Sequence, residues 1–293
     1  MTRAPLDAAI ADRRLPLAAL VVVEHGAAPR PALERLLAPL RARGAVVIER
    51  VRNDLAPGIA LADPNEALEF SGYQEGLARV LARLRVAPDR PLTVVFANDT
   101  LATGHPAPLA RLLLDALPQL GASDAPRLSG LVMPVSPAMA LVTGMRGYVS
   151  TWAFALQAPA EVLGRLRLYD PHEVVQRFAL DGAALPSAYV AWMRDWLAPS
   201  HWLRGWYKAC PGQRMDAVTQ RRKELAIYLE HRLPRRLAAL GFEMVDLGDL
   251  LSGPRAAWLA LLRRGDRLHV NRLKLRHRLP HALRRALGRQ ATP

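Results

Sequence analysis

The sequence predicts an α/β fold in which a mostly parallel sheet is covered by helices, and three observations support this. Short apolar runs rich in β-branched residues alternate with amphipathic helical segments over the first half of the chain. The 293 residues are 51% hydrophobic and 23% charged, which is enough apolar material for a full core. No Gly/Ser-rich linker or internal repeat divides the chain, so a single α/β domain with a helical C-terminal extension fits best.

The elements follow from the spacing of apolar side chains. The expected strands are continuous apolar or β-branched runs, at residues 17–23, 45–51 and 91–97. The expected helices of the first half place apolar side chains three and four positions apart, at residues 31–43, 72–85 and 108–117. In the second half, residues 221–240 and 254–264 predict helices that end at Gly241 and Gly265. Such an alternation is typical of parallel strands with helical crossovers.

Residues 128–145 form an uncharged stretch that is long enough to raise the question of a membrane span. Pro134 and Pro137 interrupt it, as do Gly130 and Gly144. These residues break the stretch into strand-sized pieces, so we expect a buried strand, a loop and a second strand here.

Charge is distributed unevenly along the chain. Forty Lys and Arg against 26 Asp and Glu leave a net charge of +14, and residues 253–293 contribute eleven basic residues and one Asp, or +10, to it. A basic segment of this kind suits anionic lipid headgroups or another polyanion. It is equally the composition of the solvated face of a terminal helix.

Cysteine and histidine usage excludes some classes of site. Cys210 is the single cysteine, which excludes a disulfide framework and a Cys-rich zinc site. The eight histidines show no paired metal-binding spacing. The low cysteine usage leads us to expect a reducing cytoplasm, and no targeting segment is evident in the sequence.

Polar side chains directly follow two of the expected strands. Glu24 and His25 come after the first strand, and Asn98 and Asp99 come after the third. Ligands of open α/β sheets bind beyond the carboxyl ends of the strands. A carboxylate and an amide at that place can bind a divalent ion or sugar hydroxyls, and His25 can contact a phosphate. The same Asn-Asp pair also favours an Asx turn, and the two interpretations stay open.

The segment before the third strand is a polar loop that runs into a helix. Asn65 is a candidate cap, and Glu69 lies near the positive end of the helix. Gly76 stands inside the helix, where glycine costs about 1 kcal/mol relative to Ala. A glycine at such a position indicates the close approach of a neighbouring strand.

This segment resembles the signature Asn-x-Gly-x-Asp-Phe-x-x-Tyr-x-x-Gly-Leu of the rhamnan-synthesis type glycosyltransferases, bacterial enzymes of surface-polysaccharide assembly. The matching positions are Asn65, Phe70, Tyr73, Gly76 and Leu77, while Ala67 replaces a glycine and Glu69 an aspartate.

Later segments resemble the same family in the same order. The strand that ends in Asn98-Asp99-Thr100 is similar to the family's Asn-Asp-Ser, and residues 148–154 are similar to its His-x-x-Ser-Tyr-Phe. Glu230 precedes Gly241 by eleven residues, as in the family's Tyr-Glu element and the helix that follows it. The closing Trp-x-x-Leu-x-x-x-Gly is similar to Trp258, Leu261 and Gly265.

The resemblance implies a GT-A-like, Rossmann-like fold and a reaction that moves a sugar, such as rhamnose or another hexose, from a nucleoside-diphosphate sugar to a polysaccharide or lipid-linked acceptor. Asn65 and Glu69 would line the nucleotide pocket, and Tyr73 and Thr100 would belong to the same binding site. Asn98 and Asp99 would face the diphosphate, with Asp99 as the ligand of Mg²⁺ or Mn²⁺. Glu230 would act as the general base. Ala97 stands where an Asp-x-Asp motif would have its first carboxylate.

In domain terms, residues 1–215 are expected to bind the nucleotide sugar, and residues 216–293 to form a basic helical extension packed on the same domain. The implied location is the cytoplasm, with peripheral contact at an anionic inner membrane through the basic segment. Two alternatives stay open. A non-catalytic scaffold of a polysaccharide complex would bind the sugar nucleotide without turnover. A nucleic-acid-binding protein would match the charge, although no nucleic-acid-binding module is recognisable in the sequence.

Overall fold

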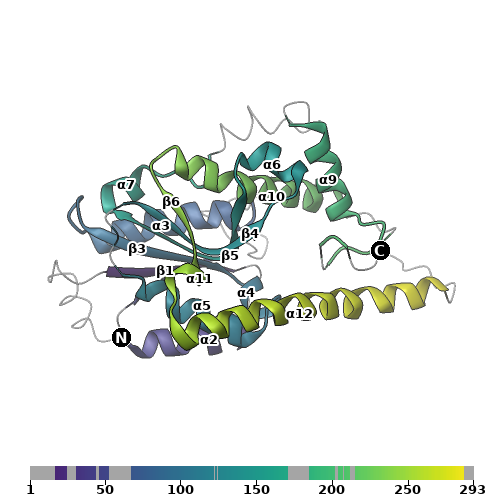
Figure 1. The fold of residues 1–293 in the computed structure, drawn as a ribbon, viewed down its shortest axis with the longest axis horizontal. Helices are drawn as coiled ribbons and strands as arrows, with labels where there is room; N and C mark the ends of the chain where they lie inside the picture. The colour runs from purple at the N-terminus through teal and green to yellow at the C-terminus, as the bar shows by residue number, and fades with distance from the viewer. Residues whose placement is uncertain are drawn as a thin grey trace, which may run out of the picture.

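The computed structural model describes residues 17–24, 31–43, 46–52, 67–121, 123, 125–170, 185–201, 204–206, 208–211 and 215–286. Within these residues, six strands form one sheet in the order β2-β1-β3-β5-β4-β6 (Figure 1). β5 runs antiparallel to both of its neighbours, and the other pairs are parallel. The strands are β1 (Leu17–Glu24), β2 (Val46–Arg52), β3 (Pro91–Asn98), β4 (Arg127–Pro134), β5 (Gly147–Pro159) and β6 (Glu243–Asp246).

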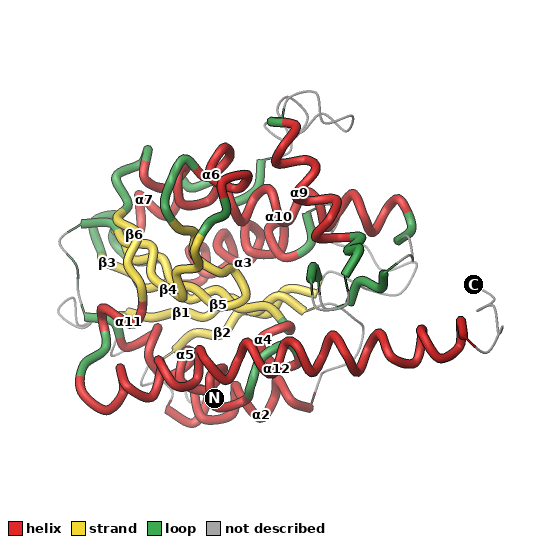
Figure 2. The backbone as a smooth tube through the Cα atoms, turned by 45° about the vertical axis from the view of Figure 1, so that its right-hand side comes forward, coloured by secondary structure: helices red, strands yellow, loops and turns green. Residues whose placement is uncertain are grey.

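Helices cover both faces of the sheet, which makes three layers (Figure 2). One face carries α3 (Glu69–Leu84), α6 (Pro137–Thr143), α7 (Ala160–Arg165), α9 (Ser187–Leu197) and α10 (Ala217–Ala238). The other carries α2 (Pro31–Arg43), α4 (Thr100–Thr103), α5 (Ala107–Ala116), the 3₁₀ turn Leu117–Gln119, α11 (Leu247–Leu250) and α12 (Gly253–Ala286). α12 runs along the second face and extends past the body of the molecule (Figure 1).

The core is split by the sheet into two apolar clusters because successive strand residues point to opposite faces. In β1, Val21 and Val23 pack towards α3, while Leu20 and Val22 pack towards α2 and α5. The expected close approach at Gly76 is confirmed, because a Cβ there would lie 2.2 Å from Cγ1 of Val21. Gly76 therefore lets α3 sit directly on β1.

The sequence predicted most of the elements before β4 closely. The helix expected over residues 31–43 is α2, the strand expected over 91–97 is β3, and the helix expected over 72–85 is α3. The α/β class, with a mostly parallel sheet flanked by helices, is confirmed and is compatible with a Rossmann-like fold.

Two expectations for the second half were wrong, and one strand was not predicted. Residues 128–145 form β4 followed by helix α6, rather than two strands, because Ser136 caps a helix that starts at Pro137. The last helix passes through Gly265, which is exposed and where a Cβ would meet nothing within 4 Å, instead of ending there. β6 is a four-residue edge strand that was not predicted, because no apolar run marks it in the sequence. In the part of the chain that the structure describes, no helix has the length and apolarity needed to cross a bilayer.

Candidate functional site

The ends of β1 and β3 lie side by side at the centre of the sheet. From β1 the chain passes through α2 on one face to β2, and then through α3 on the other face to β3. This reversal between neighbouring strands is the topological switch point where α/β sheets bind ligands. Asn98 pairs with Val23 across it, and the Asp99 amide donates to the Val23 carbonyl oxygen at 3.0 Å. The predicted Asn-Asp pair therefore stands at the expected place.

Asn98 makes the Asx turn that the sequence allowed. Its Oδ1 accepts a hydrogen bond from the Thr100 backbone N–H at 3.0 Å. Its side chain also makes a hydrogen bond with the Tyr73 hydroxyl. Asn98 therefore links the loop after β3 to the buried Tyr73. Asn98 and Asp99 are about 95% buried, at 5% and 4% exposure, and α4 begins directly after them.

The first turn of α3 brings Glu69 and Tyr73 to the same region. Glu69 is buried in that turn, where a carboxylate interacts favourably with the helix dipole. Tyr73 is fully buried, and its ring packs edge-on against Phe96 and Phe154 with centroids 5.4 and 5.5 Å away. The Tyr73 hydroxyl donates to the Thr151 carbonyl oxygen inside the protein, and the nucleotide-binding role that the resemblance implies for Tyr73 stays a prediction.

Glu230 reaches the site from α10. Its Oε1 accepts a hydrogen bond from the backbone N–H of Thr151 on β5 at 2.9 Å. Burial raises the pKa of this carboxyl to about 7, the bond from Thr151 opposes that rise, and the charge of Glu69 adds to it. The residue as a whole is partly exposed, whereas its carboxyl lies deep enough for burial to be the main cause of the raised pKa.

Thr151 joins the two helices to the sheet through its backbone. Its carbonyl oxygen accepts a hydrogen bond from the Tyr73 hydroxyl at 2.6 Å, while its N–H binds Glu230. β3 ends before it reaches Thr151, and β4 shifts register between Gly130 and Val132, so neither ladder gives this residue a partner. Side chains from α3 and α10 thus satisfy backbone groups that the sheet leaves unpaired.

The electrostatics of Tyr73 show how close the acidic groups lie. Burial raises the pKa of the Tyr73 phenol well above its ordinary value, and three carboxylates near it raise that pKa further. They are Glu69, Glu230 and Asp99. Residues from positions 69, 73, 98, 99, 151 and 230 are therefore gathered at one edge of the sheet, next to the ends of β1 and β3.

Some predicted site residues cannot be placed. Asn65 and His25 lie outside the described residues. Among the described residues, no group of three His, Cys, Asp or Glu side chains is arranged to hold a metal ion. The donor set at the end of β3 is one carboxylate, Asp99, beside an amide whose Oδ1 is already used. A divalent ion would fit there only if substrate oxygens completed its coordination shell.

An ion-pair network that was not predicted from the sequence lies on the other face of the sheet, at the ends of β1 and β2. Glu24, at the end of β1, is 1% exposed and pairs with Arg50 of β2. Arg50 also pairs with Glu34 of α2 at 2.6 Å. The hydrogen bond that Arg50 donates to the Glu24 carboxylate, with the other ion pair adding to it, raises the pKa of the Arg50 guanidinium. The opposite charges of Glu24 and Arg50, near the ends of two adjacent strands, could have predicted this ion pair.

Aromatic side chains of α9 border the Glu230 side of the site. Tyr189 donates to or accepts from His231 Nδ1 at 2.9 Å, and the rings of Trp192, Trp196 and Trp206 follow in a stacked row. Tyr189 and Met193 are buried, so they form the side of α9 that packs into the core. Lys223, whose charge lowers the pKa of Glu230, lies 5.4 Å from the Trp206 ring centroid.

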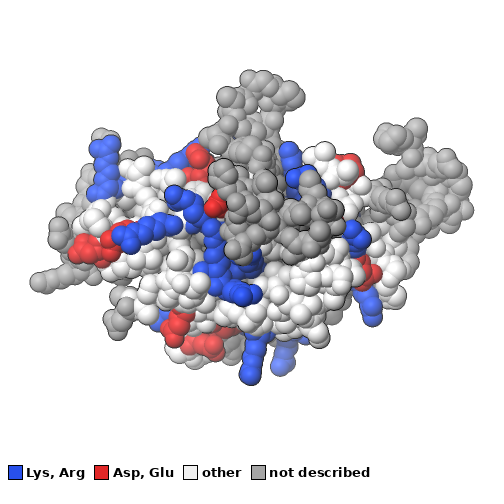
Figure 3. Space-filling model, turned by 90° about the horizontal axis from the view of Figure 1, so that it is seen from above, with Lys and Arg blue, Asp and Glu red and all other residues white. Residues whose placement is uncertain are grey.

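A separate basic hollow lies on the α3 and α10 face. It has a volume of about 470 Å³ and includes Arg165, Arg167 and Arg235 in its lining. Figure 3 looks onto the face that Figure 1 has at the top, and shows Lys and Arg side chains gathered over its middle. This concentration of positive charge is distinct from that of the C-terminal helix, which packs on the opposite face.

Comparisons of the chain with protein-family models, with curated proteins and with solved structures yield no match. Any function must therefore rest on the residues gathered at the sheet edge and on their chemistry.

Proposed function

We propose that this chain is a glycosyltransferase of GT-A-like fold that takes a sugar from a nucleoside-diphosphate sugar and passes it to a hydroxyl of a polysaccharide or lipid-linked glycan. The observation that carries the proposal is the meeting of Glu69, Asn98 and Glu230 around the Tyr73 hydroxyl. These residues belong to the segments that resemble the glycosyltransferase family, and they are far apart in the sequence. Their convergence at the switch point supports a common site.

Glu230 is the proposed general base. A carboxylate takes the proton of the acceptor hydroxyl while the hydroxyl oxygen attacks the anomeric carbon. The bond between that carbon and the diphosphate oxygen breaks, and the nucleoside diphosphate leaves with the electron pair. A general base works best when its pKa lies near the working pH, and burial raises the pKa of Glu230 to about 7. The acceptor hydroxyl would approach from the side on which the residue is partly exposed.

Asn98 and Asp99 are the proposed neighbours of the diphosphate. Their place at the end of β3 is where such sheets bind phosphate-containing ligands. Mg²⁺ or Mn²⁺, held by Asp99 and by oxygens of the diphosphate, would neutralise charge on the leaving group. Glu69 and Asn65 would contact the nucleoside. Thr100, whose backbone N–H donates to Asn98 in the turn, would belong to the same binding site.

The stacked row of Trp192, Trp196 and Trp206 is partly exposed, and its free edges would give an acceptor sugar an apolar surface to contact. The donor would carry rhamnose or another hexose. A cytoplasmic location belongs to the same proposal.

A thermal-shift panel of nucleoside diphosphates and their sugars, with and without Mg²⁺ or Mn²⁺, tests the proposal. We expect at least one compound to stabilise the chain, because a ligand that binds only the folded state raises its stability. Asp99→Ala should lose most of that stabilisation. Glu230→Gln should keep it and lose transfer of the sugar, whereas the control Glu243→Gln, at an exposed site on β6, should keep both.

Stabilisation by none of the compounds would overturn the proposal. A second outcome would favour the scaffold alternative: sugar nucleotides stabilise the chain, and no transfer or donor hydrolysis is measured for the unmodified protein with any acceptor tried. Salt-dependent binding of DNA or RNA, without any response to sugar nucleotides, would instead favour a nucleic-acid-binding protein.

A further inference from the structure

The long helix α12 has two apolar faces, and only one of them packs on the protein. Leu259 and Leu262 are buried against the helices of the second face of the sheet. A different set of large apolar side chains is exposed, between 41% and 65%, along the same helix. These are Trp258, Leu261, Leu268, Leu275 and Leu279, which we name the outer stripe.

The outer stripe is continuous along the helix. An α-helix turns by about 100° per residue, so residues seven apart, such as Leu261, Leu268 and Leu275, lie nearly above one another. Trp258 and Leu279 extend the row by three and four residues at its two ends. With a rise of about 1.5 Å per residue, the stripe is about 30 Å long. An exposed apolar row of this length marks an interaction surface.

Both parts of α12 are held, so the stripe has a fixed orientation. Near the start, Arg263 binds the Asp246 carboxylate and donates to the Val132 carbonyl oxygen at 2.7 Å. Further along, Asp266 binds the His105 ring at 2.9 Å, and that ring is stacked on Trp152. These contacts press one side of the helix onto the body and turn the outer stripe away from it.

The end of the helix that extends past the body is tied by a buried arginine. Arg278 is fully buried, and its guanidinium donates to the carbonyl oxygens of Ala209, Arg204 and Trp206 at 2.7, 2.8 and 2.9 Å. The segment after α9 therefore holds this end of α12.

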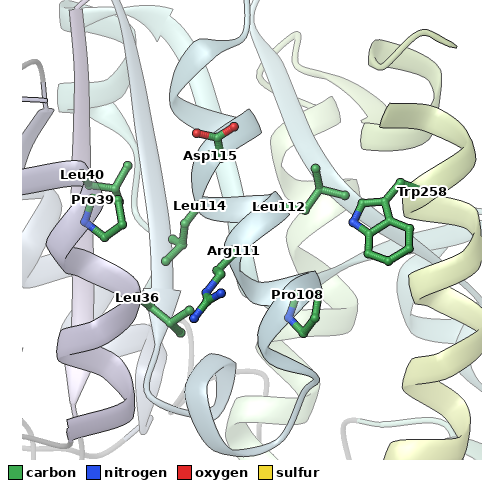
Figure 4. A pocket seen from close by; sticks show the side chains of 9 residues that line it. All are labelled: Leu36, Pro39, Leu40, Pro108, Arg111, Leu112, Leu114, Asp115 and Trp258. Carbon is green, nitrogen blue, oxygen red and sulfur yellow. The ribbon is translucent and has the colours of Figure 1, made fainter. Parts of the chain in front are cut away.

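The groove beside Trp258 continues the same surface. It lies between α2, α5 and α12, has a volume of about 410 Å³, and is lined mainly by apolar side chains such as Leu36, Leu40 and Leu112 (Figure 4). Trp258 forms the wall on the α12 side, and Arg111 reaches the groove from α5. The apolar surface thus runs from the outer stripe onto the neighbouring helices.

The charge of α12 decides which partner fits. The helix has ten basic residues and one acidic residue, Asp266, in its sequence. The basic residues are Arg255, Arg263, Arg264, Arg267, Arg272, Lys274, Arg276, Arg278, Arg284 and Arg285. At about 100° per residue, the exposed Arg264, Arg272 and Arg276 fall on or beside the outer stripe. Basic side chains that flank an apolar row are typical of helices that lie in a membrane interface.

We propose that the outer stripe and the adjoining groove form a face that docks on an anionic lipid bilayer, with the leucines and Trp258 in the acyl boundary and the arginines at the phosphates. A second copy of this chain fits poorly, because two helices of such high positive charge repel each other. A nucleic acid would pair with the arginines and leave the leucines exposed. This inference goes beyond the proposed sugar transfer and does not depend on it.

Vesicle binding by the full chain tests the docking face. We compare flotation with vesicles of phosphatidylcholine alone and of phosphatidylcholine mixed with phosphatidylglycerol. We expect binding to the mixed vesicles and its loss at high salt. The variant Leu261→Gln/Leu268→Gln/Leu275→Gln should bind at least about tenfold more weakly, because it removes three apolar contacts with the bilayer. Lipids with brominated acyl chains should quench tryptophan fluorescence less in Trp258→Phe than in the unmodified chain.

Two control variants make substitutions of the same kind, but on the opposite side of the sheet from α12. Val218→Gln/Leu240→Gln removes exposed apolar side chains from the α10 region, at 61% and 52% exposure. Arg165→Gln/Arg167→Gln removes positive charge from the basic hollow. Both should bind vesicles like the unmodified chain, and circular dichroism should show that every variant is folded.

Three results would overturn the inference: equal binding to neutral and anionic vesicles, undiminished binding of the triple leucine variant, or equal losses in the control variants. A dimer in light scattering that becomes a monomer in the triple leucine variant would assign the outer stripe to a second copy instead. Thermal shifts with sugar nucleotides are measured on the same variants. They test the proposed transfer reaction independently of vesicle binding.

Discussion

Replacing Glu230 by Gln should remove a pH dependence of stability that this carboxyl creates. Burial raises its pKa from 4.5 to about 7 in the folded chain. The folded state therefore holds the proton more tightly than the unfolded state. The stability that this provides is complete below pH 4.5 and is lost as the pH rises to about 7.

The size of the effect follows from the two pKa values. The difference between about 7 and 4.5 corresponds to about 3 kcal/mol, at 1.36 kcal/mol for each tenfold change in proton affinity. Glutamine keeps the acceptor for the Thr151 N–H and carries no charge. At pH 8 the variant should therefore be more stable than the unmodified chain by about 2–3 kcal/mol, and near pH 4 the two should differ little.

Urea unfolding at a series of pH values measures the difference directly, because the midpoints can be compared between the two proteins at each pH. Glu243→Gln serves as the control, since Glu243 is exposed. If the curves of the unmodified chain and of Glu230→Gln run parallel from pH 4 to pH 8, Glu230 has an ordinary pKa and the argument for a buried base is wrong.

Three further substitutions test the geometry. Gly76→Ala should destabilise the chain by about 1–3 kcal/mol through overlap with Val21, and adding Val21→Ala should recover part of the loss in urea unfolding. Tyr73→Phe should cost about 1–3 kcal/mol because the Thr151 carbonyl loses its buried donor, and we expect weaker sugar-nucleotide binding in calorimetry; unchanged stability would refute the bond. Arg278→Ala should unfold at least about 3 kcal/mol more easily or become sensitive to proteolysis after α9, and resistance equal to that of the unmodified chain would show that this anchor is dispensable.

Apolar runs and helical spacing predicted the first half of the fold well because each element there buries a complete face. β3 is apolar over its whole length, and α2 has its buried leucines three and four residues apart. β6 was missed because a four-residue edge strand has only partly buried side chains and is defined by its pairing with β4. Gly265 was misjudged because a glycine on an exposed helix face costs only about 1 kcal/mol, which the rest of α12 outweighs.

For the candidate site, the sequence predicted the residues better than their individual roles. Asn98, Asp99, Glu69 and Glu230 lie around Tyr73, whereas the binding and catalytic roles that the resemblance implies for them stay predictions. Tyr73 was expected to touch a ligand, yet its hydroxyl is used by Thr151 and Asn98. That contact depends on where β3 ends relative to β5, which is a matter of register between strands far apart in the chain. Local patterns carry no information about such a register.

The backbone of Thr151 also imposes an order on how the cluster comes together during synthesis. Glu230 follows Thr151 by 79 positions, so the ribosome releases the sheet edge well before the carboxyl that completes it. Until α10 emerges and docks, the Thr151 N–H lacks the Glu230 carboxylate as its hydrogen-bond acceptor. A nascent chain can therefore assemble the strand ends first, and it gains the Glu230 carboxyl only with the last helices.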